Sequence, residues 1–523
     1  FYLILFNNIM YFNIKIGLLV FLVVWCDALR LDRDIFHPKT DYPGTESRQE
    51  EKNPNFWRAK AKEQLKAHLA RQPNTNDAKN VILFLGDGMS IPTLTASRLL
   101  LGGENKQLSF ETFPYTGLSK PYCVNGQTAD SACSATAYLC GVKANEGTVG
   151  VSANVTQKDC DAMLYEKNQV SSISKWAQDA GKATGIITTT RITHASPCAN
   201  YAHIADRDWE SDTDVLKDSL NSTKCHDVAY QLIHHEPGKN FKVLLGGGRG
   251  KFLPKELKDE ENAYGDRSDG RNLIQDWKND RSRKGKAEYV WNKRQLEAID
   301  PAKTEYLLGL FENDHCKYHL DVLEEHSENE EPSLSDMVSK AIDVLSKDAN
   351  GFFLFVEGGR IDHAHHDTKP RKALDETVEL SKAVSVALNK TCEKDTLIVV
   401  TSDHAHTMSM SGFPPRGNDI FGVAKPKVDD NLPIATLTYA NGPGYYTHIN
   451  KFGGRKDYTL AVNTQDKDYL APSLAPLGEE THGADDVAVF AKGPWSHLFT
   501  GNYEQNLIPH MMAYAANIGR NEL

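Results

Sequence analysis

The chain has 523 residues and a net charge of -11, from 59 basic and 70 acidic side chains. With 40% hydrophobic and 25% charged residues, its composition is typical of a globular protein, and the length allows one large core or several domains. The acidic balance argues against a nucleic-acid partner. Binding of an anion would therefore depend on local positive charge, such as metal ions or an arginine.

The first segment of the chain is apolar. A run at residues 16–25, preceded by Lys15 and followed by small residues, predicts a secretory signal peptide over residues 1–28, of which residues 1–9 are expected not to be native. The run is short for a membrane span, so we expect no transmembrane segment in the mature chain. The protein is expected to be secreted or to lie on the extracellular face of the cell membrane. There, the Asn-x-Ser/Thr sequons are candidate glycosylation sites, at Asn154, Asn221 and Asn389.

The sequence has nine cysteines, of which Cys26 would leave with the signal peptide. The others are too few, in so long a chain, for a scaffold built from disulfides, and they include no Cys-x-x-Cys pair. The core must therefore come from packing. Spacing alone does not show which cysteines pair.

Residues 29–79 are polar and predict an exposed leader with one helix at residues 57–70. From residue 80 onward, short apolar runs predict strands buried on both faces, at residues 81–85, 185–189, 243–245, 352–356, 397–400 and 487–490. Helical patterns lie between them, at residues 173–180, 334–346 and 371–388. This alternation predicts a single large α/β domain over residues 80–515, with a mostly parallel sheet covered by helices on both faces. Residues 250–288 and 413–477 break the alternation and are expected to be surface insertions; residues 516–523 form a tail.

Metal-ligand side chains follow several of these strands. Asp87 follows the first run, Glu357 and residues 362–366 follow the run at 352–356, and Asp403 and His404 follow the run at 397–400. In open α/β sheets, ligands bind beyond the carboxyl ends of the strands, so these side chains should converge. Carboxylates and imidazoles without thiolates suit catalytic zinc, and a carboxylate-rich corner with a hydroxyl suits magnesium. The sequence thus predicts more than one metal.

Helical spacing leaves one ligand undecided. His366 is four residues after Asp362 and His365 is three residues after it, so both histidines share a helix face with that carboxylate. Spacing does not choose between them.

The segment 128–137 contains small side chains and predicts a helix that begins near Ser131. Free amide groups and the helix dipole at that end favour an anion, such as an alkoxide or a phosphate. An isolated Asp-Ser pair would more simply be a helix cap, but the neighbouring metal ligands favour Ser131 as a nucleophile.

Together these motifs resemble the alkaline phosphatase family, and its animal members in particular. The resemblance covers about residues 80–515 and is carried by residues 86–88, 130–132, 189–197, 357–366, 403–404 and 480–483. It implies a phosphomonoester hydrolase with an alkaline optimum, small phosphomonoester substrates, and a phosphoserine on Ser131. Diesterases usually use threonine as the nucleophile, sulfatases need a modified residue, and a non-enzymatic binding protein would be expected to lack a metal ligand.

Residue by residue, the resemblance implies two zinc ions and one magnesium ion. The first zinc would be bound by Asp362, His366 and His482; the second by Asp87, Asp403, His404 and the Ser131 oxygen; the magnesium by Asp87, Ser196 and Glu357. The resemblance thus favours His366 over His365 as the ligand of the first zinc. His194 and His363 would lie just outside the ligands, and Arg207 would grip phosphate through its forked guanidinium.

The resemblance also implies a Cys160–Cys225 disulfide, with Cys140 left as a buried free thiol, and a homodimer. A calcium site of animal members corresponds to Glu261, the Phe311 carbonyl, Glu312 and Glu331. Phe413 stands where vertebrate members have a tyrosine near the dimer contact.

Overall fold

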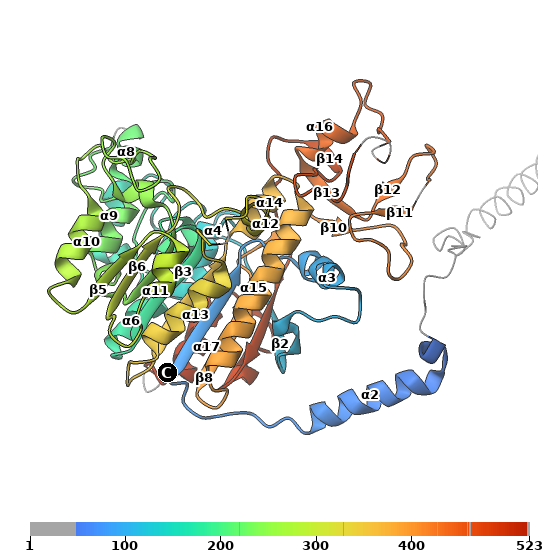
Figure 1. Cartoon of the computed structure of the whole chain (residues 1–523), viewed down its shortest axis with the longest axis horizontal. Helices are drawn as coiled ribbons and strands as arrows, with labels where there is room; N and C mark the ends of the chain where they lie inside the picture. Colours follow the sequence, from blue (N-terminus) through green and yellow to red (C-terminus); the bar gives the residue numbers. More distant parts are fainter. Residues whose placement is uncertain are drawn as a thin grey trace, which may run out of the picture. The chain divides into compact units, whose positions relative to one another are not determined.

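A ten-stranded sheet forms the core of the protein in the computed structural model (Figure 1). The strands lie in the order β17-β2-β16-β8-β1-β7-β3-β4-β6-β5. Their bounds are β1 Asn80–Gly86, β2 Tyr115–Lys120, β3 Ala183–Arg191, β4 Val243–Gly247, β5 Ala287–Val290, β6 Tyr306–Leu310, β7 Phe352–Gly358, β8 Thr396–Thr401, β16 Val487–Lys492 and β17 Gly501–Glu504. Only β16 runs antiparallel to its neighbours among these described strands. The predicted mostly parallel sheet is therefore confirmed.

The structure describes residues 49–519 except Ser219, Glu328, Pro426, Tyr458, Leu460 and Ala461. The predicted signal peptide, the leader before residue 49 and the last four residues of the tail lie outside this part of the chain. The helix expected at residues 57–70 is α2, Pro54–Leu69, and none of its residues, all of them described, is buried.

The remaining helices cover the sheet or join its strands. They are α3 Ile91–Leu100, α4 Ser131–Cys140, α5 Cys160–Met163, α6 Ile173–Asp179, α7 Ala195–Cys198, α8 Asp212–Lys217, α9 Val228–His234, α10 Leu273–Arg281, α11 Lys293–Ala298, α12 His319–Glu324, α13 Leu334–Leu345, α14 Arg360–His366, α15 Pro370–Lys390, α16 Gly444–His448 and α17 Leu507–Ala515. Short 3₁₀ turns are η2 Gln49–Lys52, η3 Ser109–Thr112, η4 Glu166–Asn168, η5 Gly238–Asn240, η6 Arg249–Phe252 and η7 Ser496–Phe499.

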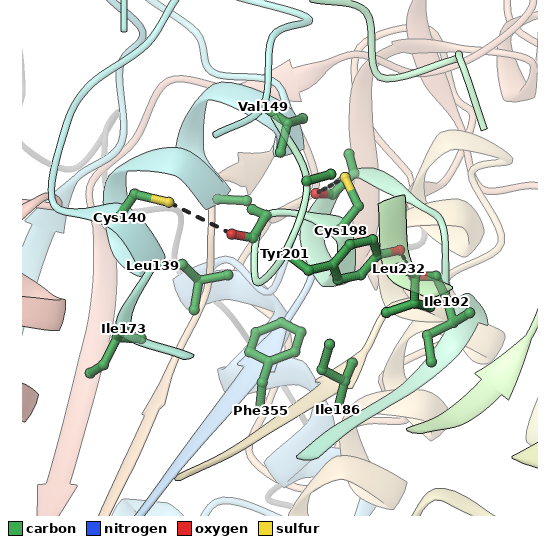
Figure 2. Close-up of a cluster of buried hydrophobic side chains, with 14 of the residues drawn as sticks. Leu139, Cys140, Val149, Ile173, Ile186, Ile192, Cys198, Tyr201, Leu232 and Phe355 are labelled. Carbon is green, nitrogen blue, oxygen red and sulfur yellow. Dashed lines mark hydrogen bonds between the residues drawn. The ribbon is translucent and has the colours of Figure 1, made fainter. Parts of the chain in front are cut away.

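Alternate residues of β1 enter two separate cores. Val81, Leu83 and Leu85 pack with α4, α6 and α17 on one face of the sheet, whereas Ile82 and Phe84 pack with α13 and α15 on the other. Because both faces are covered, the strands have the continuous apolar sequences that predicted them. Figure 2 shows part of the first core, where Leu139 and Cys140 of α4 lie above Phe355 of β7 and Ile186 of β3.

The segment 413–477, together with β10 just before it, forms small sheets separate from the central one. β13 Leu437–Gly442 lies between β10 Ser409–Met410 and β14 Ser473–Pro476, and β11 Val423–Lys425 pairs with β12 Ile434–Ala435. A further two-stranded ladder joins β9 Ala405–His406 to β15 His482–Gly483. The segment 250–288, by contrast, contains α10 and ends in β5, which adds an edge strand to the central sheet.

Two disulfides are present among the described cysteines. One is Cys160–Cys225, as expected. The other, Cys123–Cys133, was not predicted. Cys140 is buried and has no disulfide partner in the described part of the chain. No helix within the described residues is long and apolar enough to cross a membrane.

Candidate metal centre

Neighbouring parallel strands deliver three buried carboxylates to one edge of the sheet. Asp87 follows β1, Asp403 follows β8, and Glu357 lies near the end of β7; each is 0% exposed. Both oxygens of Asp87 lack a hydrogen-bond partner within the described residues. One oxygen of Asp403 and one oxygen of Glu357 lack a partner as well. Buried carboxylates without donors are costly unless a cation compensates them. Their oxygens are therefore well suited to hold metal ions.

The electrostatics of these carboxylates agree with that interpretation. Burial, followed by the nearby charges of Asp403 and Asp362, raises the pKa of Asp87 well above its usual value. Burial also raises the pKa of Asp403, and it raises the pKa of Glu357 to about 7. Crowded carboxylates resist ionisation in the absence of a counter-charge, and a divalent cation would supply that charge.

Two of the residues expected to bind magnesium, Glu357 and Ser196, lie on β7, which pairs with β3, and on the short helix α7 that follows β3. One oxygen of Glu357 accepts hydrogen bonds from the hydroxyls of Thr188 and Thr190, the second at 3.1 Å. Its other oxygen is the one without a partner among the described groups. Ser196 lies on the short helix α7 and is 0% exposed. Carboxylate and hydroxyl oxygens are the ligand types that suit a hard cation.

A second group joins Asp87 and Asp403 to His404. One ligand atom from each lies within 4.8 Å of the others, so a single ion could reach all of them. The Nε2 atom of His404 is 3.4 Å from an oxygen of Asp87 and 3.1 Å from an oxygen of Asp403. The Ser131 hydroxyl lies 3.2 Å from the same Nε2 atom. These are the residues expected around the second zinc.

Ser131 is the first residue of α4 and is 1% exposed. The side chain of Asp130 caps the helix by accepting a hydrogen bond from the Cys133 amide at 3.1 Å. The small side chains that follow are all buried, which lets the first turn lie close to the metal residues. The interpretations of Asp130 as a cap and of Ser131 as a nucleophile are therefore compatible.

The third group is centred on Asp362, which α14 carries with its side chain buried. The Nε2 atom of His366 lies 3.4 Å from one oxygen of Asp362, and that of His482 lies 3.4 Å from the other. The two Nε2 atoms are 3.1 Å apart. Although burial acts in the opposite direction, His366 holds the pKa of Asp362 well below its usual value. These three side chains are the set expected for the first zinc.

His365 faces a different environment. Its two ring nitrogens lie 3.0 Å from the Thr93 hydroxyl and 2.9 Å from the Tyr439 hydroxyl. Both nitrogens of His365 are thus engaged in hydrogen bonds, whereas His366 contacts the Glu480 carbonyl through Nδ1 and leaves Nε2 beside Asp362. The geometry supports His366 as the ligand where helical spacing left the two open.

His406 was missed by the sequence analysis. The β9–β15 ladder pairs it with His482, and its ring bridges two carboxylates: Nδ1 is 2.5 Å from Glu480 and Nε2 is 2.6 Å from Asp362. Although burial opposes it, these two carboxylates raise the pKa of His406 to about 10. The i, i+2 spacing of His404 and His406 could have indicated a strand with both rings on one face.

Arg207 is half-buried and lies against the start of α4. Its guanidinium donates to an Asp130 oxygen at 3.2 Å and lies 3.3 Å from Nε2 of His194.

His194 and His363 form a cluster with His315, in which one ring nitrogen of each lies within 4.8 Å of the others. His315 was also missed, because it follows β6, whose apolar run is interrupted by glycine. Burial, followed by positive charge nearby, lowers the pKa of His194 and His315.

All four residues expected to bind calcium line one cavity of about 190 Å³. They are Glu261, Phe311, Glu312 and Glu331. Burial and the charge of Glu261 raise the pKa of Glu312, and burial and the charge of Glu312 raise the pKa of Glu331, so a cation would be favoured here. Glu261, however, forms an ion pair with Arg249.

The asparagines of the three sequons, Asn154, Asn221 and Asn389, are exposed.

Comparison with known proteins gives a consistent result. Residues 78–518 match the family model described as alkaline phosphatase. The chain is 48% identical over 480 residues to the membrane-bound alkaline phosphatase of Bombyx mori, covering 90% of this chain and 86% of that protein. It is 49% identical over 486 residues to the tissue-nonspecific alkaline phosphatase isozyme of Rattus norvegicus, covering 90% of each.

Solved structures share the fold. The alkaline phosphatase of Thermus thermophilus aligns with a TM-score of 0.60 at 20% identity, covering 86% of this chain and 94% of that one. The alkaline phosphatase of the Antarctic bacterium TAB5 aligns with a TM-score of 0.56 at 21% identity, covering 85% and 99%.

Proposed function

The chain belongs to the alkaline phosphatase family and is a phosphoric monoester hydrolase; from that premise we propose that it acts through a phosphoserine on Ser131. The observation that carries the proposal is the convergence, near this serine, of buried carboxylate oxygens that accept no hydrogen bond from the described residues. Asp87 and Asp403 lie beside His404, whose ring is 3.2 Å from the Ser131 hydroxyl. A nucleophile in this position is surrounded by ligands for cations.

We assign the metal ligands as the resemblance implied. Asp362, His366 and His482 would hold one zinc; Asp87, Asp403, His404 and Ser131 would hold a second; Asp87, Ser196 and Glu357 would hold magnesium. The mixed histidine and carboxylate sets suit zinc, and the all-oxygen set suits magnesium. When bound, the ions would supply Lewis-acid chemistry, lowering the pKa of coordinated hydroxyl groups and neutralising phosphate oxygens.

The protein's own groups then perform a two-step displacement. The Ser131 oxygen attacks phosphorus, the ester bond breaks, and the leaving alcohol takes a proton. Water attacks the phosphoserine in the second step, releasing phosphate and restoring Ser131. Arg207, which Asp130 holds at 3.2 Å, grips two phosphate oxygens in both steps. The N-terminal amides of α4 favour the charge that collects there. We expect an alkaline optimum, because hydroxide favours the second step.

Three further assignments complete the proposal. The cavity that Glu312 and Glu331 line would take calcium. The enzyme would act outside the cell, which the two disulfides support, because disulfides persist in oxidising compartments. It would work as a homodimer on small phosphomonoesters.

Turnover and metal content test the proposal together. We expect p-nitrophenyl phosphate to be hydrolysed far faster than bis-p-nitrophenyl phosphate. Dialysis against a chelator should remove turnover, and zinc with magnesium should restore it. Full activity after verified metal removal, or equal turnover of the diester, would contradict the proposal.

A further inference from the structure

The Cys123–Cys133 disulfide closes a short loop that leads into the proposed nucleophile. The two cysteines are 10 positions apart in the sequence, and each is 2% exposed. With Ala129 and Ala144 they form a small buried cluster of their own. Cys133 lies in the first turn of α4, two residues after Ser131. The bond therefore ties the start of this helix to the loop that precedes it.

Consecutive residues within the closed loop contact different parts of the site. The Ala129 carbonyl oxygen lies 2.8 Å from Nδ1 of His482, the histidine assigned to the first zinc. This contact engages Nδ1 and so leaves Nε2 of His482 as the nitrogen that would bind a zinc ion. Ser131 is the proposed nucleophile. One loop thus sets the position of a metal ligand and of the attacking oxygen.

Asp130, which lies between them, connects the loop to the phosphate-binding arginine. One of its oxygens accepts the Cys133 amide at 3.1 Å. The other accepts the Gly147 amide and the Arg207 guanidinium, each at 3.2 Å. The backbone of Arg207 is held in turn, because its amide donates to the Gly147 carbonyl at 2.8 Å. A shift of Cys133 would therefore move the carboxylate that orients Arg207.

We propose that Cys123 and Cys133 are positioning residues for the reaction: their disulfide holds the backbone of residues 129–131 so that His482, Arg207 and Ser131 keep their catalytic geometry. The inference rests on the proposed function and deepens it. A loop this short adds less stability by chain entropy than the Cys160–Cys225 loop, whose cysteines are 65 positions apart. The main effect of the Cys123–Cys133 bond should thus be on geometry.

The experiment compares removal of the two disulfides. Cys123→Ala/Cys133→Ala should lower kcat/KM for p-nitrophenyl phosphate by about 10- to 100-fold, the usual effect of losing groups that orient ligands. It should also raise the inhibition constant of inorganic phosphate, because Arg207 is less well held. Cys160→Ala/Cys225→Ala is the matched control and should lower the Tm more, while its kcat/KM at 25 °C stays within about twofold of wild type. If the first variant does not fold, Cys123→Ser breaks the same bond with a smaller change in packing.

Three outcomes are distinguishable. Wild-type protein that does not hydrolyse the monoester would contradict the proposed function itself. Active wild type, with an unchanged kcat/KM and phosphate inhibition constant in the folded Cys123→Ala/Cys133→Ala variant, would overturn only the positioning role. If both disulfide variants lose kcat/KM in proportion to their loss of Tm, the positioning role is overturned as well.

Discussion

The Nε2 atom of His406 lies 2.6 Å from a carboxylate oxygen of Asp362, and the opposite nitrogen of the same ring lies 2.5 Å from Glu480. This chain of contacts orients the carboxylate assigned to the first zinc. His406→Ala should therefore weaken zinc binding by about 10- to 100-fold without removing a direct ligand. Zinc titration followed by turnover measures the effect. Glu480→Gln, which keeps the shape, should weaken binding less; unchanged zinc affinity in His406→Ala would contradict this role.

The three histidines of α14 should differ in their effects. His366→Ala removes a direct ligand and leaves Asp362 and His482, so bound zinc and turnover should both collapse, because catalytic zinc normally keeps three protein ligands. His363→Ala and His365→Ala should be milder, at most about 10- to 100-fold. Zinc per chain in the three purified variants decides between them. A full complement in His366→Ala with a deficit in His365→Ala would reverse the assignment.

Glu376 on α15 should make stability depend on pH. It is 4% exposed, accepts the His319 amide at 2.7 Å, and has its pKa raised by burial to about 7. The unfolded carboxyl titrates near 4.5, so the folded state binds the proton more tightly, and stability falls as pH rises from 4.5 to 7. Glutamine does not titrate, so the Glu376→Gln variant should not lose this part of its stability as the pH rises.

Thermal unfolding at pH 5 and pH 8 measures the effect of Glu376. The Tm of Glu376→Gln, relative to wild type, should be higher at pH 8 than at pH 5. The corresponding change in the free energy of unfolding is about 3 kcal/mol at most. Comparison with wild type at each pH cancels effects shared by both proteins. The same difference in Tm at both pH values would contradict the titration.

The strands that deliver the site were predictable because they are buried on both faces. β1, β7 and β8 have continuous apolar sequences, and their carboxyl ends hold Asp87, Glu357 and Asp403. The two edge strands, β17 and β5, and the strand β2 beside β17 could not be recognised in this way. β2 is only partly buried, and β5 and β17 are short, so tertiary pairing rather than sequence pattern determines them.

The missed residues have a common cause. His406 and His315 reach the site through strand pairing and through a loop distant in sequence, and neither directly follows one of the apolar runs that drew attention to Asp87, Glu357 and Asp403. The Cys123–Cys133 pair likewise depends on the distance between two backbone positions, 5.7 Å between Cα atoms, which spacing in the sequence does not give. Helical spacing also could not separate His365 from His366, because both lie on the face of Asp362.

The cysteines should differ in reactivity. Burial raises the pKa of Cys140 to about 12, so little thiolate is present and little reagent can reach it. Cys392 is exposed. Iodoacetamide at pH 8 should therefore label Cys392 in the folded protein and Cys140 only after unfolding. Peptide mapping without reduction, by mass spectrometry, checks this; a disulfide that contains Cys140 would contradict it.

Ser131→Ala should lose nearly all turnover of p-nitrophenyl phosphate while keeping most of its zinc. The nucleophile disappears, but Asp87, Asp403 and His404 remain around the second metal. Ser134→Ala, on the same helix and also buried, is the matched control and should retain activity. Loss of zinc in parallel with turnover would instead make Ser131 a structural residue.

The most direct test is to trap the phosphoserine itself. Wild-type enzyme is mixed with labelled phosphate or substrate, quenched in acid and digested, and the phosphorylated peptide is identified by mass spectrometry. The account predicts phosphate on Ser131 in the wild type and none in Ser131→Ala. Phosphate trapped on a different residue, or undiminished turnover in Ser131→Ala, would contradict it.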